Sequence, residues 1–160
     1  MRKKYFFSVV VISWILIAPY AEAHAETKLD FWMARFGAEL GIAESQLALG
    51  EMYRKGEVVR FNLELATYWL QKAAEQGIPE AQSGLALMYE KGVGGWRNLG
   101  KNPVHAYAYY NLGALNGDET AAAKRDEIGR KMKPDQIKEA QELTRQMVNQ
   151  FPGMREVTPE

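Results

Sequence analysis

Small and apolar residues recur along the middle of the chain with the spacing of amphipathic helices. In residues 41–56 they fall at positions i, i+4, i+7 and i+8, and the same spacing returns in residues 77–92. Such a period places one apolar face along a helix. Each stretch ends at a glycine, Gly56 or Gly92, which can adopt the left-handed conformation that closes a helix. A second helical stretch follows each of them, so the pattern predicts antiparallel helix pairs.

The two stretches are copies of one structural unit. Aligned at an offset of 36, residues 41–56 and 77–92 are identical at nine of sixteen positions. Further along, the offset becomes 40, so that Ala74 matches Ala114, because the connecting loop of the second unit is four residues longer. Residues 38–41 also match the end of the first unit. We therefore expect the repeats to begin with the second half of an incomplete unit.

The repeated residues are similar to those of a known family. The first unit reads Ala-Glu-x-Gln-x-x-Leu-Gly-x-Met-Tyr-x-x-Gly, followed after a loop by Ala-x-x-Trp-Leu-x-x-Ala-x-x-x-Gly. Over residues 41–117 this pattern resembles the Sel1-like repeat (SLR), a relative of the tetratricopeptide repeat. The resemblance implies an all-α fold, a right-handed α-solenoid of antiparallel helix pairs. It also implies a protein-interaction scaffold, which in bacteria is often exported.

Past Gly117 the repeat pattern decays, and Arg125 stands where the second unit has Leu85. The last helices of a stacked array need a polar outer face. We therefore interpret the diverged residues as capping helices. The predicted organisation is a signal peptide (1–25), a partial repeat helix (26–40), a first SLR repeat (41–76), a second SLR repeat with a loop insertion (77–117), a capping helix pair (118–150) and a flexible tail (151–160).

The first 25 residues have the layout of a secretory signal peptide. Basic residues 2–4 precede an almost uninterrupted apolar run over residues 5–18, and residues 21–23 and 23–25 each offer a small-x-small cleavage site. An uncleaved anchor is the alternative, but the run is shorter than the roughly 20 residues that span a membrane. We therefore expect a periplasmic or secreted protein that is not inserted in a membrane after cleavage.

Charge and cysteine content narrow the function classes. The chain has 20 basic and 20 acidic residues and no cysteine. A balanced charge argues against nucleic acid as the partner, because phosphate neutralisation requires a local excess of lysine and arginine. An exported chain without cysteine has neither disulfides nor thiolate metal ligands, so its stability must come from packing between repeats.

Residue types and spacings that would indicate catalysis are missing from the sequence. His105 is the one histidine outside the predicted signal peptide, and a lone histidine is far more often a surface or core-edge residue than a base or ligand. No His-Glu-x-x-His motif occurs, and the glycine-rich residues 92–95 lack the strand context of a dinucleotide-binding loop. We therefore expect no catalytic residues, no metal site and no cofactor.

Because no catalytic residues are expected, partner binding is the remaining candidate function of the surface. The first helices of successive units line one concave face of a helix-pair solenoid, so their residues off the core stripe are the candidates. These are Leu47, Glu51 and Arg54 in the first unit and Ser83, Leu87 and Glu90 in the second. For the two leucines, packing against a neighbouring helix is an equally good interpretation.

The expanded loop of the second unit is a further candidate. It carries Trp96 beside Arg97, and insertions in repeat proteins map to loops that often bear function. Tryptophan and arginine are also the commonest anchors in protein interfaces. Alternatively, Trp96 covers the edge of its own repeat, and the two interpretations are evenly matched.

Two function classes follow. The first is an exported, non-enzymatic scaffold or regulator that binds a protein or peptide on its concave face, as a monomer or a homodimer. The second is an envelope hydrolase that acts on cell-wall polymer, suggested by the predicted compartment and by some members of the family that the chain resembles. Because no convergent catalytic set is found, the sequence favours the scaffold.

Overall fold

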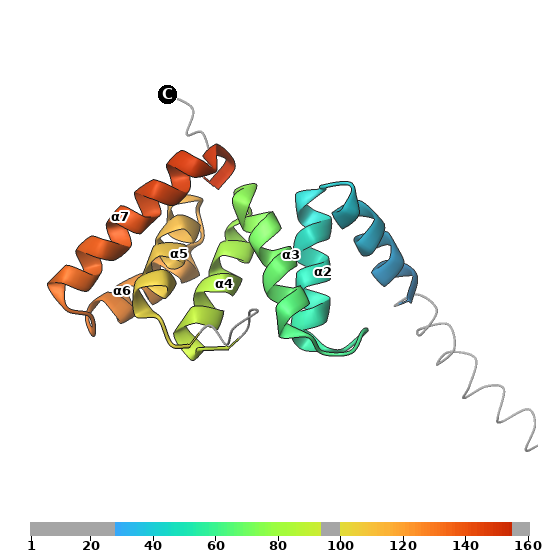
Figure 1. Ribbon diagram of the computed structural model, residues 1–160, viewed down its shortest axis with the longest axis horizontal. Coiled ribbons are helices and arrows are strands. Elements are labelled where there is room, and N and C mark those ends of the chain that lie inside the picture. Colours follow the sequence, from blue (N-terminus) through green and yellow to red (C-terminus); the bar gives the residue numbers. More distant parts are fainter. Residues whose placement is uncertain (1–27, 94–99, 155–160) are drawn as a thin grey trace, which may run out of the picture.

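The computed structural model describes residues 28–93 and 100–154, and within them the regular structure is helical (Figure 1). Residues 28–39 form an N-terminal helix. It is followed by α2 (Ala43–Lys55), α3 (Leu63–Glu75), α4 (Pro79–Lys91), α5 (Pro103–Leu115), α6 (Glu119–Gly129), α7 (Pro134–Gln150) and the short 3₁₀ helix η1 (Pro152–Met154). The predicted signal peptide and the loop residues Trp96 and Arg97 lie outside the described residues.

The repeat helices pack in the order in which they occur along the chain. α2 pairs with α3, α4 pairs with α5, and α3 packs against α4 to join the two pairs. Figure 1 shows the resulting row of helices, from the N-terminal helix in blue to α7 in red. Stacked helix pairs of this kind make an all-α solenoid, which confirms the predicted fold class.

Local signals in the sequence set the ends of these helices. Gly56 and Gly92 close α2 and α4 with φ values of 71° and 72°, which a residue without a Cβ adopts at little cost. Asn62, Asn102 and Asp118 precede α3, α5 and α6, and each side chain accepts a hydrogen bond from a backbone N–H in the first turn.

Glycines allow neighbouring helices to approach closely around Leu70. This α3 residue is fully buried and faces both α2 and α4. A Cβ placed on Gly50 of α2 would lie 2.9 Å from Leu70 Cγ, and one on Gly84 of α4 would lie 3.6 Å from Leu70 Cδ1. A large side chain of the second helix thus fills the space that two glycines of the first helices leave.

The C-terminal helices differ from the predicted capping pair. α6 packs on α5, and α7 also packs mainly on α5 rather than along α6. Ile128 is the one large apolar side chain of α6, and it is already buried in the main core, so α6 offers little apolar surface to α7. α7 instead buries Ala140 and Thr144. The hydroxyl of Thr144 lies 3.4 Å from the carbonyl oxygen of Ala108 on α5.

The expectation of a flexible tail from residue 151 is wrong for residues 151–154. η1 packs against α7 and α3, and Met154 is only 2% exposed. Gly153 lies directly on the end of α3, where a Cβ on Gly153 would be 3.1 Å from the carbonyl oxygen of Glu75. So short a segment has no periodicity, and its burial depends on helices far away in the sequence.

Candidate functional site

The candidate residues that the structure describes lie on the first helices of the two units. We call this set the first-helix face: Leu47, Glu51, Arg54, Ser83, Leu87 and Glu90. The first three belong to α2 and the others to α4. All six are partly buried, so the face is a half-covered surface rather than a fully exposed one.

On α2, two of the three candidates form an ion pair. Arg54 Nη2 and Nε donate to the two carboxylate oxygens of Glu51 at 2.6 and 2.8 Å. The hydrogen bonds from this pair raise the pKa of Arg54, which therefore stays charged. Leu47 packs against the main core, in agreement with the interpretation of this leucine as a packing residue. Glu51 and Arg54 are thus the polar groups that α2 contributes to the face.

On α4, the polar candidates hold neighbouring helices in place. The Ser83 hydroxyl donates to the carboxylate of Asp118, the residue that caps α6. Glu90 Oε2 accepts a hydrogen bond of 2.9 Å from the hydroxyl of Tyr110 on α5. Burial and this carboxylate together raise the pKa of the Tyr110 phenol. Ser83 and Glu90 therefore have a structural role in the free protein.

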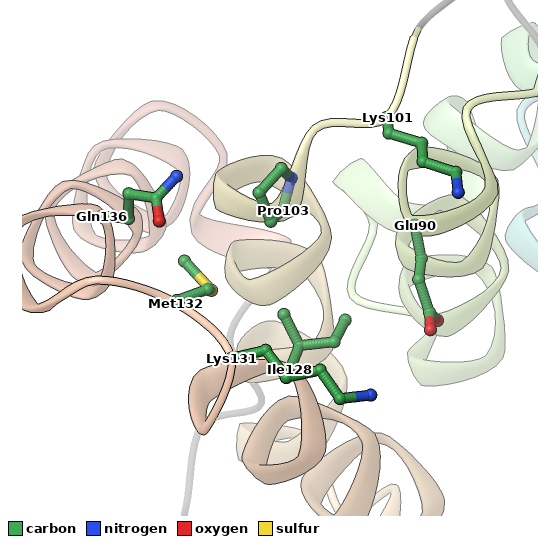
Figure 2. A pocket seen from close by; sticks show the side chains of 7 residues that line it. All are labelled: Glu90, Lys101, Pro103, Ile128, Lys131, Met132 and Gln136. Atoms are coloured by element: carbon green, nitrogen blue, oxygen red, sulfur yellow. The ribbon is translucent and has the colours of Figure 1, made fainter.

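A pocket of about 300 Å³ opens beside Glu90, where the ends of α4 and α6 meet the starts of α5 and α7. Figure 2 shows Pro103, Ile128 and Met132 gathered near its centre, with Gln136 on one side and Glu90 and Lys101 on the other. Lys131 completes the lining. The pocket thus combines an apolar floor with two ammonium groups and one carboxylate at its rim.

His105 lies near this region but lacks the partners of a catalytic base. Its ring packs against Tyr89 with 4.9 Å between ring centroids, and Nδ1 is buried without a hydrogen-bond partner among the described residues. Burial lowers the pKa of His105, and the charge of Glu139 on α7 opposes this effect. A neutral imidazole at the edge of the core fits these contacts.

Neither a metal-ligand cluster nor a membrane-spanning helix occurs in residues 28–93 and 100–154. No group of three or more His, Cys, Asp or Glu side chains could hold a metal ion there. No helix in these ranges is long and apolar enough to cross a membrane.

Comparison with protein families identifies the repeats. The family model described as Sel1 repeat matches residues 43–78 and 79–118. The chain therefore contains two Sel1 repeats. The two matches are 36 and 40 residues long, the two offsets at which the units align. Sel1 repeats generally mediate interactions between proteins.

Solved structures with the same fold are similar to this chain. One is a protective antigen present in uropathogenic Escherichia coli strains that displays an SLR fold, with a TM-score of 0.72 and 26% identity. The match covers 81% of this chain and 27% of the antigen. Another is a Sel1 repeat protein from Oxalobacter formigenes, with a TM-score of 0.55 and 31% identity over 62% of this chain and 39% of that one. This chain therefore spans a minor part of each relative. No curated protein matches it significantly.

The first Sel1 repeat contains a buried amide cluster that the sequence analysis did not single out. Gln46, 5% exposed, donates from Nε2 to the carbonyl oxygen of Ala38 at 3.3 Å. Gln76 Nε2 donates to Gln46 Oε1 at 2.8 Å and to the carbonyl oxygen of Gly41 at 3.0 Å. We call Gln46, Gln76 and the Gly41 carbonyl the first amide relay.

The second Sel1 repeat has the same cluster at equivalent positions. Gln82 Nε2 donates to the carbonyl oxygen of Ala74 at 3.2 Å. Asn116 Nδ2 donates to Gln82 Oε1 at 3.0 Å and to the carbonyl oxygen of Gly77 at 3.3 Å. We call Gln82, Asn116 and the Gly77 carbonyl the second amide relay. A glutamine that recurs on the buried face of both repeats was the available signal, because buried amides need partners.

The N-terminal helix carries an apolar stripe on its outer face. Its residues follow the spacing of one helix face and are exposed: Leu29, Trp32, Met33, Phe36 and Leu40. The opposite face buries Ala34 and Ala38 in a small cluster with Leu49 of α2. This stripe is the largest run of exposed apolar side chains on one described helix, and such runs are typical of interaction surfaces.

Proposed function

We propose that this protein is an exported, non-enzymatic scaffold that binds a segment of a partner protein along the first-helix face. The pocket beside Glu90 takes an apolar side chain of that segment. This pocket is the observation that carries the proposal, because it continues the first-helix face and offers both apolar surface and charge. Pockets that combine an apolar floor with a few polar groups are the usual anchor sites of recognition.

The lining of the pocket specifies the kind of segment that fits. Pro103, Ile128 and Met132 suit an aliphatic or aromatic side chain, whose burial provides the affinity. Lys101 at the rim suits a carboxylate next to that side chain, whereas Lys131 already pairs with Glu127 at 2.9 Å and adds less attraction. Glu90 already accepts the Tyr110 hydroxyl, so it contributes less net attraction for a cation. The partner segment is therefore an apolar residue flanked by aspartate or glutamate.

The proposal also covers the export of the protein and its oligomeric state. The basic start, apolar run and small-residue sites of residues 1–25 support secretion to the periplasm or beyond. Balanced charge supports a protein partner rather than nucleic acid. The protein acts as a monomer or a homodimer, and the apolar stripe of the N-terminal helix is the surface through which two copies would pair. N-terminal sequencing of the exported protein would return residue 24 or 26 if cleavage occurs, and Met1 if it does not.

Site-specific photo-crosslinking tests where the partner binds. A photoreactive amino acid at Gln136, which lines the pocket from α7, is expected to capture one protein in living cells. The same probe at Gln141, an exposed position of α7, is the matched control and should capture much less of it. Mass spectrometry of the crosslink then identifies both the partner and the segment in contact. Equal capture from both positions would contradict binding at the pocket.

Charge reversal tests how the identified segment is held. The variant Lys101→Glu should weaken binding of the synthetic segment by about tenfold or more, since an attractive charge becomes repulsive. Lys138→Glu changes the charge of an exposed residue on α7 and should leave the affinity within about twofold. If both variants bind with wild-type affinity by calorimetry, Lys101 has no part in recognition.

A further inference from the structure

The second amide relay holds a segment of the chain itself. The carbonyl oxygen of Met154 accepts hydrogen bonds from Gln82 Nε2 at 3.3 Å and from Asn116 Nδ2 at 2.6 Å. The side chain of Met154 is buried in the main core. The relay thus recognises a backbone carbonyl, while the neighbouring core takes the apolar side chain of the same residue.

The contact between the C-terminal segment and the second amide relay requires a glycine in each of the two backbones. A Cβ on Gly77 would lie 1.9 Å from the carbonyl oxygen of Gly153, and a Cβ on Gly153 would lie 3.3 Å from Gln76 Cα. The two backbones are therefore in direct contact. A residue with a side chain at Gly153 would have to move the segment away from the relay.

The first amide relay has the same donors but no such segment among the described residues. Gln46 Nε2 makes one hydrogen bond there, whereas Gln82 Nε2 makes two. A Cβ on Gly41 would meet nothing within 4 Å. Beside it Ile42 is 48% exposed, whereas the equivalent Ile78 packs against the core. The first amide relay is therefore formed, and one Nε2 hydrogen of Gln46 has no acceptor among the described residues.

We propose that the first amide relay binds a tight turn of a partner protein in which glycine is followed by a large apolar residue. The glycine would lie on the backbone of residues 39–41, as Gly153 lies on residues 75–77. The carbonyl of the apolar residue would accept the free hydrogen of Gln46 Nε2. Its side chain would cover Leu40 and Ile42, which are exposed in the free protein.

This site is separate from the pocket of the proposed function. The relay lies at the turn before α2, and its copy lies at the start of α4, whereas the pocket lies at the far end of α4. Thirteen helical residues separate those two ends, a distance of about 20 Å. Binding at the relay and binding at the pocket can therefore succeed or fail independently.

NMR titration with a peptide copied from the chain tests the inference. The probe is the blocked hexapeptide of residues 149–154, Asn-Gln-Phe-Pro-Gly-Met, added to the full-length 15N-labelled chain. The side-chain amide signals of Gln46 and Gln76 are expected to shift in a saturable way. The signals of Lys101 and Lys131 beside the pocket should not follow the same curve.

Two altered peptides serve as controls that cannot affect folding of the protein. Replacing the glycine of the probe by alanine should weaken binding at least about tenfold, because the added methyl group meets the backbone of residues 39–41. Replacing its methionine by alanine should weaken binding to a similar extent, because the apolar contact with Ile42 is lost. If the probe causes no shift, or if the alanine peptides bind as tightly as the probe, the inference is wrong.

A matched pair of protein variants locates the binding. Gln76→Ala removes one amide of the relay at an exposed position and should abolish the shift at Gln46, while circular dichroism reports whether the fold is kept. Gln71→Ala, at an exposed position on α3, the helix that Gln76 caps, should leave binding unchanged. Shifts confined to Gln82 and Asn116 would mean that the probe only displaces residues 152–154, which overturns the inference. So would shifts at Gln46 that grow with protein concentration without peptide, since a second copy would then be the occupant.

Discussion

The amide of Asn116 donates a hydrogen bond of 2.6 Å to the carbonyl oxygen of Met154, across 38 residues of sequence. Asn116 lies at the end of α5, and Met154 lies at the end of η1. The carbonyl also accepts Gln82 Nε2, from the first helix of the same repeat. One backbone oxygen therefore connects the C-terminal segment to both helices of the second repeat, which makes residues 152–154 part of the solenoid.

The substitution Met154→Ala should lower the free energy of unfolding by about 2–4 kcal/mol, because a fully buried side chain is replaced by a cavity in the main core. Urea unfolding followed by circular dichroism measures the change. Leu115→Ala is the matched control, since Leu115 is 56% exposed at the end of α5, and its effect should stay within about 0.5 kcal/mol. Equal effects of the two substitutions would show that η1 does not stabilise the fold.

The repeat helices could be predicted from the sequence because both of their determinants are local. Periodic apolar residues define each helix, and a glycine marks its end, as at Gly56 and Gly92. Because the unit is duplicated, the same pattern predicts the same helix pair a second time, independently. Pairing between helices that follow one another along the chain is also the usual arrangement.

The C-terminal arrangement could not be predicted in this way. Packing of α7 on α5 depends on the lack of apolar surface on α6, and the burial of Met154 depends on a glutamine 72 residues away. Nothing in the local sequence reports such long-range contacts. The same holds for the candidate site. The sequence suggests that Ser83 and Glu90 are free polar residues, but in the structure they form hydrogen bonds with Asp118 and Tyr110.

Gly50 and Gly84 face the same leucine but should respond in opposite directions to alanine. At Gly50 the new Cβ would lie 3.1 Å from the backbone nitrogen of Leu70, so Gly50→Ala should destabilise the fold by about 1–3 kcal/mol. At Gly84 the nearest atom would be 3.6 Å away, an ordinary contact. Gly84→Ala should therefore stabilise α4 by up to about 1 kcal/mol through helix propensity. Thermal unfolding of both variants provides the comparison, and a gain at Gly50 would contradict the close helix approach.

Removal of the Tyr110 hydroxyl should cost stability because the hydroxyl binds a carboxylate. Tyr110→Phe is expected to lower the free energy of unfolding by about 1–2 kcal/mol, while the ring keeps its packing. In Glu90→Gln the amide can still accept the hydrogen bond, so the loss should be smaller. A double-mutant cycle between the two positions measures the interaction itself. A coupling energy near zero would show that the contact contributes nothing in solution.

Acidification should destabilise the fold through His105. Burial lowers the pKa of this imidazole in the folded state, whereas in the unfolded chain the imidazole has its ordinary pKa near 6.5. Below that pH the unfolded chain therefore binds this proton more readily than the folded protein does. The stability present above that pH is therefore lost progressively as the pH falls below about 6.5. Uptake of a single proton limits this loss to about 1.4 kcal/mol per pH unit, and the partial exposure of the side chain keeps the pH range of the loss narrow. Urea unfolding at pH 7.5 and 5.5 measures this loss in the wild-type chain and in His105→Phe, which keeps an aromatic ring against Tyr89 but cannot titrate. The two chains share every other ionisable group, so their difference isolates His105. An identical pH dependence of both chains would mean that the imidazole is equally easy to protonate in the folded and unfolded states.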